Sequence, residues 1–193
     1  MAGIYAEGMA TGDATFETEL PTWDGWDADH LPEPRLVAEH GGEVVGWAAL
    51  APVSGRPVYA GVAEVSLYVS AAARRTGVGR VLLQSLVEAA DGTGLWTLQA
   101  GIFPENAASI RVHEACGFRV VGVRERLGRQ GTRWRDVVLP KRRGRLATAH
   151  PEHASRNAIR PDPRQQCCTR RRGGGTRLAG VAERRPRPAE IPG

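Results

Sequence analysis

Apolar and polar side chains alternate most regularly between residues 61 and 70. In an extended strand, every second side chain points to the same face. Four apolar residues therefore share one face, namely Ala63, Val65, Leu67 and Val69. The opposite face carries Glu64, Ser66 and Tyr68. This pattern predicts a strand with one apolar and one largely polar face.

Shorter patterns predict the elements around this strand. The dipeptide Gly41-Gly42 favours a two-residue hairpin turn. Apolar runs predict further strands over 36–39, 44–50, 95–103, 118–126 and 133–139. Helical spacing of apolar residues predicts one helix over 77–90, and a second helix opens at Pro104 and ends at Gly117. A hairpin, a long strand, a helix, a strand, a helix and a hairpin together predict an α/β (α+β) fold, a mixed sheet with helices packed on it.

Length and composition indicate one globular domain. The chain has 193 residues, of which 41% are hydrophobic, so an ordinary core can form. No run of about 18 apolar residues is present to span a membrane. Residues 1–14 lack the basic start and apolar stretch of a secretory signal, so we expect a cytoplasmic protein. The three cysteines show neither a disulfide framework nor metal-ligand spacing, and we expect no metal.

The net charge of +5 is distributed unevenly along the chain. Residues 144–193 hold 11 Arg and 4 acidic residues, whereas residues 1–143 hold 15 basic and 17 acidic ones. We therefore predict a nearly neutral domain over 1–143 and a basic, disordered tail over 144–193. A solvated tail without a function is favoured over a tail that binds nucleic acid.

A glycine-rich segment, residues 74–80, joins the central strand to the predicted helix at 77–90. Gly77 and Gly79 let the backbone approach a ligand, and the helix N-terminus attracts an anion. Three arginines add positive charge, namely Arg74, Arg75 and Arg80. The segment predicts a diphosphate site, with a plain helix start as the alternative.

Two further features carry candidate chemistry. Asn106, Ser109 and His113 lie three and four residues apart, so they share one helix face that would suit a ligand groove or a solvated surface. Glu64 lies within the most strand-like segment. It is either an exposed strand carboxylate or a partly buried general base with a raised pKa.

Taken together, these signals resemble the GCN5-related N-acetyltransferase (GNAT) superfamily, whose pyrophosphate-binding signature is similar to Arg74-x-x-Gly77-x-Gly79. The resemblance narrows to the phosphinothricin N-acetyltransferase family and covers about residues 1–143. It is carried by the segments 15–19, 36–39, 42–47, 56–59, 63–69, 104–106, 112–118 and 133–137. The family usually has a first strand and most of a first helix ahead of the segment that resembles Ile4-Tyr5, so we expect the domain over 1–143 to lack the usual first strand. Residues 144–193 also lack family character.

The resemblance implies a mostly antiparallel sheet with a splayed central strand pair and acetyl-CoA as co-substrate. Glu64 would be the general base, directly or through water, and His113 the other catalytic residue. The coenzyme would be held by Leu67, Tyr68 and Val69 through their backbone, by Gly77, Val78, Gly79 and Arg80 at the pyrophosphate, and by Asn106 and Ser109 along its length. The acceptor pocket would be shaped by Phe16, Arg56 and Tyr59.

The implied reaction is acetyl transfer to the amino group of a small acidic amino-acid-like molecule. Phosphinothricin, methionine sulfoximine and related glutamate analogues are the acceptors that the resemblance implies, in a protein that forms a homodimer. Two alternatives stay open, namely a GNAT enzyme acting on protein N-termini or other amines, and a nucleic-acid-binding protein acting through its tail. The near-neutral charge of residues 1–143 disfavours nucleic acid as a partner.

Overall fold

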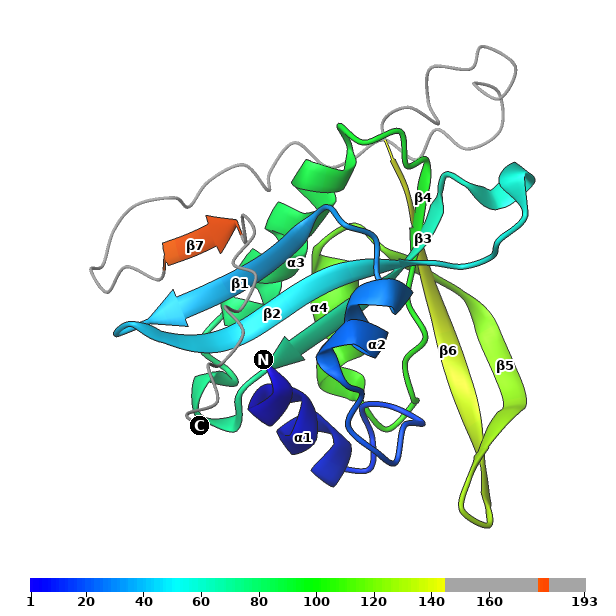
Figure 1. Ribbon diagram of the computed structural model, residues 1–193. Helices are drawn as coiled ribbons and strands as arrows, with labels where there is room; N and C mark the ends of the chain where they lie inside the picture. Colours follow the sequence, from blue (N-terminus) through cyan, green and yellow to red (C-terminus); the bar gives the residue numbers. More distant parts are fainter. Residues whose placement is uncertain (145–176, 181–193) are drawn as a thin grey trace, which may run out of the picture.

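The computed structural model describes residues 1–144 and the backbone of residues 177–180. Seven strands form one sheet in the order β5-β6-β4-β3-β2-β1-β7 (Figure 1). Only β3 and β4 run parallel, and all other neighbours are antiparallel. The strands are β1 (Arg35–His40), β2 (Glu43–Pro52), β3 (Val62–Val69), β4 (Thr97–Gln99), β5 (Arg119–Gln130), β6 (Arg133–Arg143) and β7 (Arg177–Gly180).

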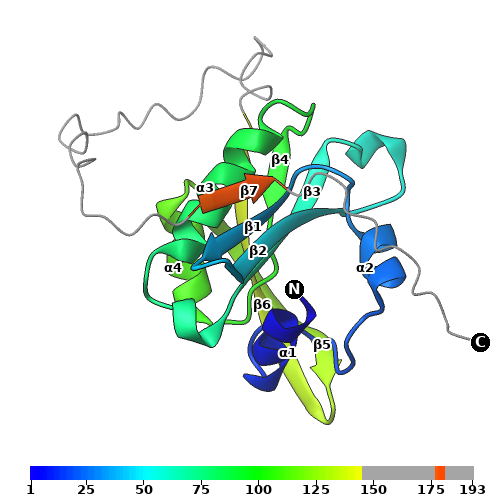
Figure 2. The same cartoon turned by 60° about the vertical axis from the view of Figure 1, so that its left-hand side comes forward.

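Helices cover both faces of the sheet. They are α1 (Ala2–Ala10), α2 (Trp23–Asp29), α3 (Val78–Ala90) and α4 (Ala107–Ala115), with short 3-10 helices η1 (Pro57–Tyr59) and η2 (Ala71–Ala73). In Figure 2, α3 and α4 lie on one side of β1 to β3, and α1 and α2 on the other. The observed architecture confirms the predicted mixed sheet flanked by helices.

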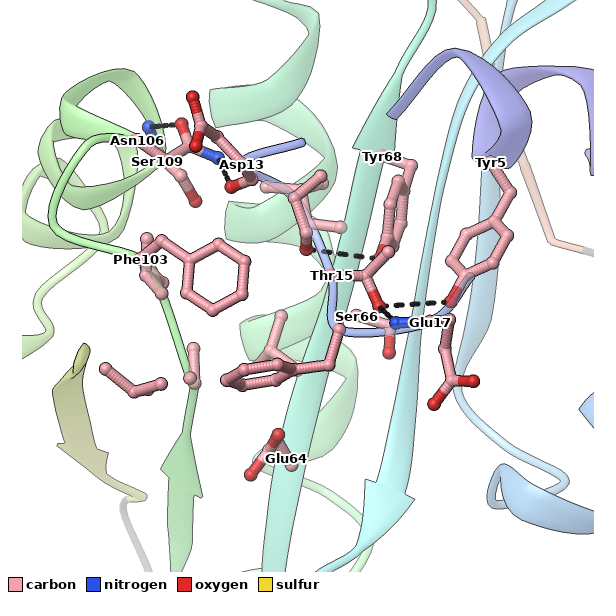
Figure 3. Close-up of a pocket in the computed structure, with 18 of the residues that line it drawn as sticks. Tyr5, Asp13, Thr15, Glu17, Glu64, Ser66, Tyr68, Phe103, Asn106 and Ser109 are labelled. Carbon is pink, nitrogen blue, oxygen red and sulfur yellow. Dashed lines mark hydrogen bonds between the residues drawn. The ribbon is translucent and has the colours of Figure 1, made fainter. Parts of the chain in front are cut away.

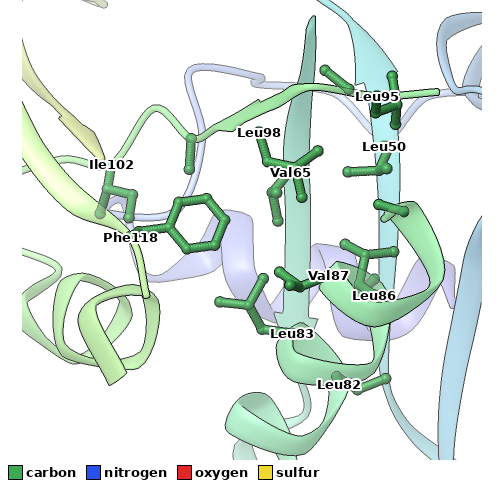
Figure 4. Packing of buried hydrophobic residues seen from close by; sticks show 14 of the residues in the cluster. Leu50, Val65, Leu82, Leu83, Leu86, Val87, Leu95, Leu98, Ile102 and Phe118 are labelled. Carbon is green, nitrogen blue, oxygen red and sulfur yellow. The ribbon is translucent and has the colours of Figure 1, made fainter. Parts of the chain in front are cut away.

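Strand β2 shows what this double coverage requires of the sequence. Its residues Gly46–Leu50 are all buried, a continuous run typical of strands covered on both faces. Ala48 and Leu50 pack in the larger core with α3, and Trp47 and Ala49 pack on the other face. Four α3 side chains fill the larger core (Figure 4), namely Leu82, Leu83, Leu86 and Val87.

The predicted strand over 95–103 is wrong in extent, because β4 pairs with β3 only at Thr97–Gln99. Beyond Gln99 the chain continues along β6, with which β4 is already paired: the Ala100 amide donates to the Pro140 carbonyl, and Ile102 forms a bridge with Val138. Strand β3 nevertheless continues to Val69. The two parallel strands therefore separate after three residue pairs, as expected for a splayed central pair.

Two helices, α1 and α2, were not predicted. Trp26 from α2 packs with Ile4 and Trp47 on the second face of the sheet. Within residues 1–144 and 177–180, no helix is long and apolar enough to cross a membrane. The predicted tail over 144–193 lies outside the described residues, except for Gly144 and β7, whose backbone pairs with β1.

Candidate active site

A cavity of about 660 Å³ opens where β3 and β4 separate. Its wall is built by β3, the end of α2, the chain after β4, α4 and the loop over residues 13–21, here called the acceptor loop. Figure 3 shows this loop crossing β3 beside Ser66, with Glu64 further along the strand. The volume lies within the range of small-molecule sites.

The polar face of β3 looks into this cavity, as its alternation predicts. Glu64, Ser66 and Tyr68 all line it, and Ala63 and Val65 lie in the core on the other face. The pairing of β3 with β2 is uniform, so no β-bulge shifts the alternation. Glu64 is half-buried, and one of its carboxylate oxygens accepts a hydrogen bond from Gln99 Nε2 at 3.1 Å.

Within the described residues, no strand pairs with the β4 side of β3 beyond Glu64, where the Val69 carbonyl accepts from Arg74 Nε at 3.5 Å. The amide of Ser70 donates to the Val45 carbonyl of the β2 side, and hydrogen bonds alternate along an antiparallel strand. The backbone groups of Leu67 and Val69 consequently face the gap, which fits their predicted role. By the same alternation, the backbone groups of Tyr68 face β2 and not the gap. Tyr68 lines the cavity with its ring.

The glycine-rich segment, residues 74–80, follows β3 and contains the first residues of α3. Arg75 and Gly77 adopt left-handed backbone conformations, with φ of 65° and 92°. The first bond of the helix runs from the Val81 amide to the Gly77 carbonyl, so the amides of residues 78–80 have no partner within the helix. These amides, with the exposed side chains of Arg74, Arg75 and Arg80, fit a diphosphate group.

Helix α4 brings the predicted polar stripe to the cavity. Asn106 caps the helix by accepting from the Ser109 amide at 3.1 Å, and its Nδ2 donates to the Asp13 carbonyl at 3.3 Å. Asn106, Ser109 and His113 all line the cavity. The side chain of Asn106 therefore has two structural roles: it caps α4, and it holds the acceptor loop at Asp13.

His113 is only 2% exposed. Its Nδ1 lies 2.9 Å from the Ser109 carbonyl oxygen and therefore carries the proton that it donates there. Burial lowers the pKa of His113, which the Ser109 hydrogen bond only partly offsets, so the ring is neutral at pH 7. Nε2 has no hydrogen-bond partner in the described part of the chain. In this state His113 can accept a proton, and it must be protonated before it can act as an acid.

Phe16 lies in the cavity wall, as predicted. Its ring meets Phe103 edge to face at 4.7 Å, and it packs so close to Gly128 that a Cβ there would lie 2.6 Å away. Arg56 and Tyr59 are exposed on the loop between β2 and β3 and do not line the cavity. The guanidinium of Arg56 lies over the Tyr59 ring, with its Cζ 5.6 Å from the ring centroid. Their proposed role in acceptor binding stays a prediction.

Three residues near this cavity were not predicted from the sequence. Arg124 of β5 and His30 at the end of α2 line it, and Arg135 of β6 holds the acceptor loop. Arg124 lies in an exposed strand, and its sequence pattern does not distinguish it from the neighbouring arginines. No local signal marks His30 or Arg135, because their partners lie far away along the chain.

Arg135 is a charged side chain with only 4% exposure. Its guanidinium donates to the Gly12 carbonyl at 2.9 Å and pairs with Asp13 at 2.8 Å and Glu105 at 3.2 Å. It also stacks on the Phe103 ring, 4.0 Å from its centroid. One side chain thus fixes the start of the acceptor loop to the sheet.

We expect Arg135→Ala to lower the free energy of unfolding by about 2–4 kcal/mol, because several charge-assisted hydrogen bonds are lost. The acceptor KM should also rise, because the loop wall is released. Urea unfolding and steady-state kinetics measure the two effects. Arg133→Ala is the matched control: Arg133 also pairs with Glu105, but it is exposed, so less than about 1 kcal/mol should be lost. Equal losses in both variants would contradict the role given to Arg135.

Comparisons with known proteins agree with this geometry. Residues 7–118 match the model of the Acetyltransferase (GNAT) family. A phosphinothricin N-acetyltransferase of Alcaligenes faecalis is 35% identical over 149 residues, which cover 74% of this chain and 75% of the relative. An L-methionine sulfoximine/L-methionine sulfone acetyltransferase of Salmonella typhimurium is 36% identical, over 56% of this chain and 64% of that protein.

Among solved structures, YncA of Salmonella typhimurium with its cofactor acetyl-CoA superposes with a TM-score of 0.69 at 30% identity. The match covers 81% of this chain and 90% of YncA. Fold and cavity therefore define an acetyltransferase, and the chain belongs to the GNAT family. Within it, the chain is a member of the phosphinothricin N-acetyltransferase-like group, which confirms the resemblance seen in the sequence.

Proposed function

We propose that this protein transfers an acetyl group from acetyl-CoA to the amino group of a small amino acid in the cavity at β3. The observation that carries the proposal is the position of Glu64. Its carboxylate faces the cavity from the strand whose far end leads into the glycine-rich start of α3. In this proposal Glu64, the base, lies on the same strand that leads to the anion site at the start of α3.

In this proposal, the amides of residues 78–80 and the neighbouring arginines hold the diphosphate of acetyl-CoA. The backbone groups of Leu67 and the amide of Val69 hold its pantetheine arm, while the Val69 carbonyl accepts from Arg74 Nε. When bound, acetyl-CoA supplies the thioester that reacts. Glu64 takes a proton from the acceptor ammonium, since only the neutral amine is a nucleophile. His113, with its free Nε2, is the second catalytic candidate.

The charges of the cavity wall support an amino acid as the acceptor. Four of its carboxylates can attract an ammonium group, namely Glu17, Glu19, Asp29 and Glu64. Apart from histidines, Arg124 is the one basic side chain among the described residues that line the cavity. Its guanidinium can bind the carboxylate of an amino acid through two parallel hydrogen bonds. The names of the two relatives point to phosphinothricin and methionine sulfoximine. The acidic cavity wall favours methionine sulfoximine over phosphinothricin, because the side-chain group of methionine sulfoximine carries no additional negative charge.

A thiol-release assay with acetyl-CoA tests this proposal against a panel of acceptors. The panel contains methionine sulfoximine, methionine sulfone, phosphinothricin, ordinary amino acids, a peptide with a free N-terminus and a polyamine. We expect the highest kcat/KM for methionine sulfoximine or sulfone. A preference for the peptide would establish the alternative of protein N-terminal acetylation, and a preference for the polyamine that of other amines.

Arg124→Ala should raise the acceptor KM by about tenfold or more and leave the acetyl-CoA KM unchanged, because it removes a charge-assisted bond to the carboxylate. The matched variant is Arg56→Ala, on the exposed loop outside the cavity wall, where we expect a smaller change. Steady-state kinetics with both substrates varied separates the effects. A larger rise in acceptor KM for Arg56→Ala would favour the predicted role of Arg56 over that of Arg124.

The homodimer remains part of the proposal. Large apolar side chains are exposed on β5 and β6, where β5 is an edge strand. They are Val120, Val121, Val123, Leu127 and Trp134. An exposed apolar surface of this kind supports association with a second copy of the chain.

A further inference from the structure

His30 contributes its imidazole to the cavity wall next to the polar face of β3. The ring stacks on the Trp26 indole, with centroids 4.3 Å apart and planes inclined by 22°. Its Nδ1 lies 2.7 Å from the Trp26 carbonyl oxygen, and its Nε2 lies 3.2 Å from Ser66 Oγ. Both ring nitrogens are therefore engaged, one with α2 and one with β3.

These partners fix the positions of the protons. A carbonyl oxygen only accepts, so Nδ1 carries the proton, and Nε2 of the neutral ring is an acceptor. The Ser66 hydroxyl must then donate to Nε2. Ser66 Oγ retains its lone pairs and, as part of the cavity wall, can accept a hydrogen bond from an ammonium group bound there.

Acetyl transfer to an ammonium group needs two deprotonations. The ammonium nitrogen carries three protons, and the amide nitrogen of the product retains one of them. One of the two released protons goes to the departing thiolate and the other to solvent. Glu64 can hold only one proton at a time. A second proton acceptor on the same face of β3 could therefore take the other proton that leaves the acceptor nitrogen.

We propose that Ser66 and His30 form a second proton-accepting pair, which acts beside Glu64 on the acceptor nitrogen. In this step a nitrogen–hydrogen bond breaks as the proton passes to Ser66 Oγ, and the hydroxyl proton of Ser66 passes to His30 Nε2. The resulting imidazolium is partly exposed and releases its proton to water. The pair rests on the proposed acetyl transfer and extends it.

The surroundings of His30 suit this role. Burial is the main cause that lowers the pKa of His30, and the Arg35 charge lowers it further. The hydrogen bond to Trp26 and the carboxylates of Asp29 and Asp27 raise it in part. The ring is consequently neutral at pH 7 and ready to accept a proton. Once protonated, it is stabilised by these two carboxylates, and Glu64 faces the same cavity.

Ser66→Ala, His30→Gln and the double variant test the pair with the acceptor that the parent protein uses best. We expect each single variant to lower kcat by roughly tenfold, less than a sole base contributes because Glu64 remains. The double variant should be no slower than the slower single one, because the two residues act as a unit. Ser66→Thr, which keeps the hydroxyl, should restore most of the rate.

The pH dependence of kcat/KM is the readout that a structural role would not move. Neutral His30 is needed, so the parent rate should fall as the pH drops through the lowered pKa of His30, below its ordinary value of 6.5. That inflection should be missing in His30→Gln. The control is His40→Gln, at the exposed end of β1, which should behave like the parent.

Additive losses, no rescue by Ser66→Thr, or an unchanged pH profile in His30→Gln would each overturn the pair. Should His30→Gln fold poorly, Ser66→Ala decides alone, because it leaves the contacts between His30 and Trp26 in place. A parent protein that acetylates no amine would refute the proposed function itself. An active parent with fully active variants would refute only the pair.

Discussion

Glu64→Gln should lower kcat by about 10²–10⁴-fold, the usual contribution of a positioned general base. The amide keeps the size of the side chain and one oxygen that can accept from Gln99 Nε2, so this contact and the fold should persist. The KM for acetyl-CoA should stay within about twofold, since coenzyme binding does not need the base. Stopped-flow or steady-state thiol release measures the rate.

The pH–rate profile provides a second criterion for Glu64. In the parent protein, the acidic limb reflects protonation of the base, so part of this limb should flatten in Glu64→Gln. Glu88→Gln on the exposed surface of α3 is the matched control, with the same chemical change far from the cavity. A change of less than threefold with an unchanged profile would make Glu64 a passive strand carboxylate and direct the search to His113 or a water chain.

Gly79→Trp should weaken acetyl-CoA binding by at least about 100-fold, or ~2.8 kcal/mol at 1.4 kcal/mol per tenfold change. Gly79 lies in the first turn of α3, and a Cβ there would already contact Val69 at 3.4 Å. A bulky indole would fill the space that the diphosphate needs in front of the free amides. Isothermal titration calorimetry measures the affinity directly.

A matched control exists for this substitution in α1. Gly3 is also the second residue of its helix, and a Cβ there would have no neighbour within 4 Å. Gly3→Trp should therefore bind acetyl-CoA like the parent protein. Equal affinities for Gly79→Trp and Gly3→Trp would show that the diphosphate does not lie at the start of α3.

The central part of the site was predictable because its signals are local. The alternation around Glu64 lies within one strand, and the glycines at 77 and 79 mark the start of α3 directly in the sequence. The spacing of Ser109 and His113 also follows from a single helix. Each of these predictions needed only the geometry of one element.

The parts that were missed depend on contacts between distant segments. Arg135 shares a strand face with the buried Val137, but its charge alone favours exposure. Its burial depends on partners in the acceptor loop, more than a hundred residues earlier. His30 obtains its role from Ser66, across 36 residues. The separation of β4 from β3 after Gln99 depends on β6, because the chain keeps its pairing with β6 through Ala100 and Ile102 while its pairing with β3 ends.

We propose that acetyl transfer takes place in the gap between β3 and β4. A crystal structure of the protein with acetyl-CoA is the decisive test of this position. We predict the diphosphate at the amides of residues 78–80, the pantetheine arm between β3 and β4, and the acetyl group beside Glu64 in the cavity. Acetyl-CoA bound outside the gap between these strands, or an acetyl group out of reach of the Glu64 face of β3, would contradict it.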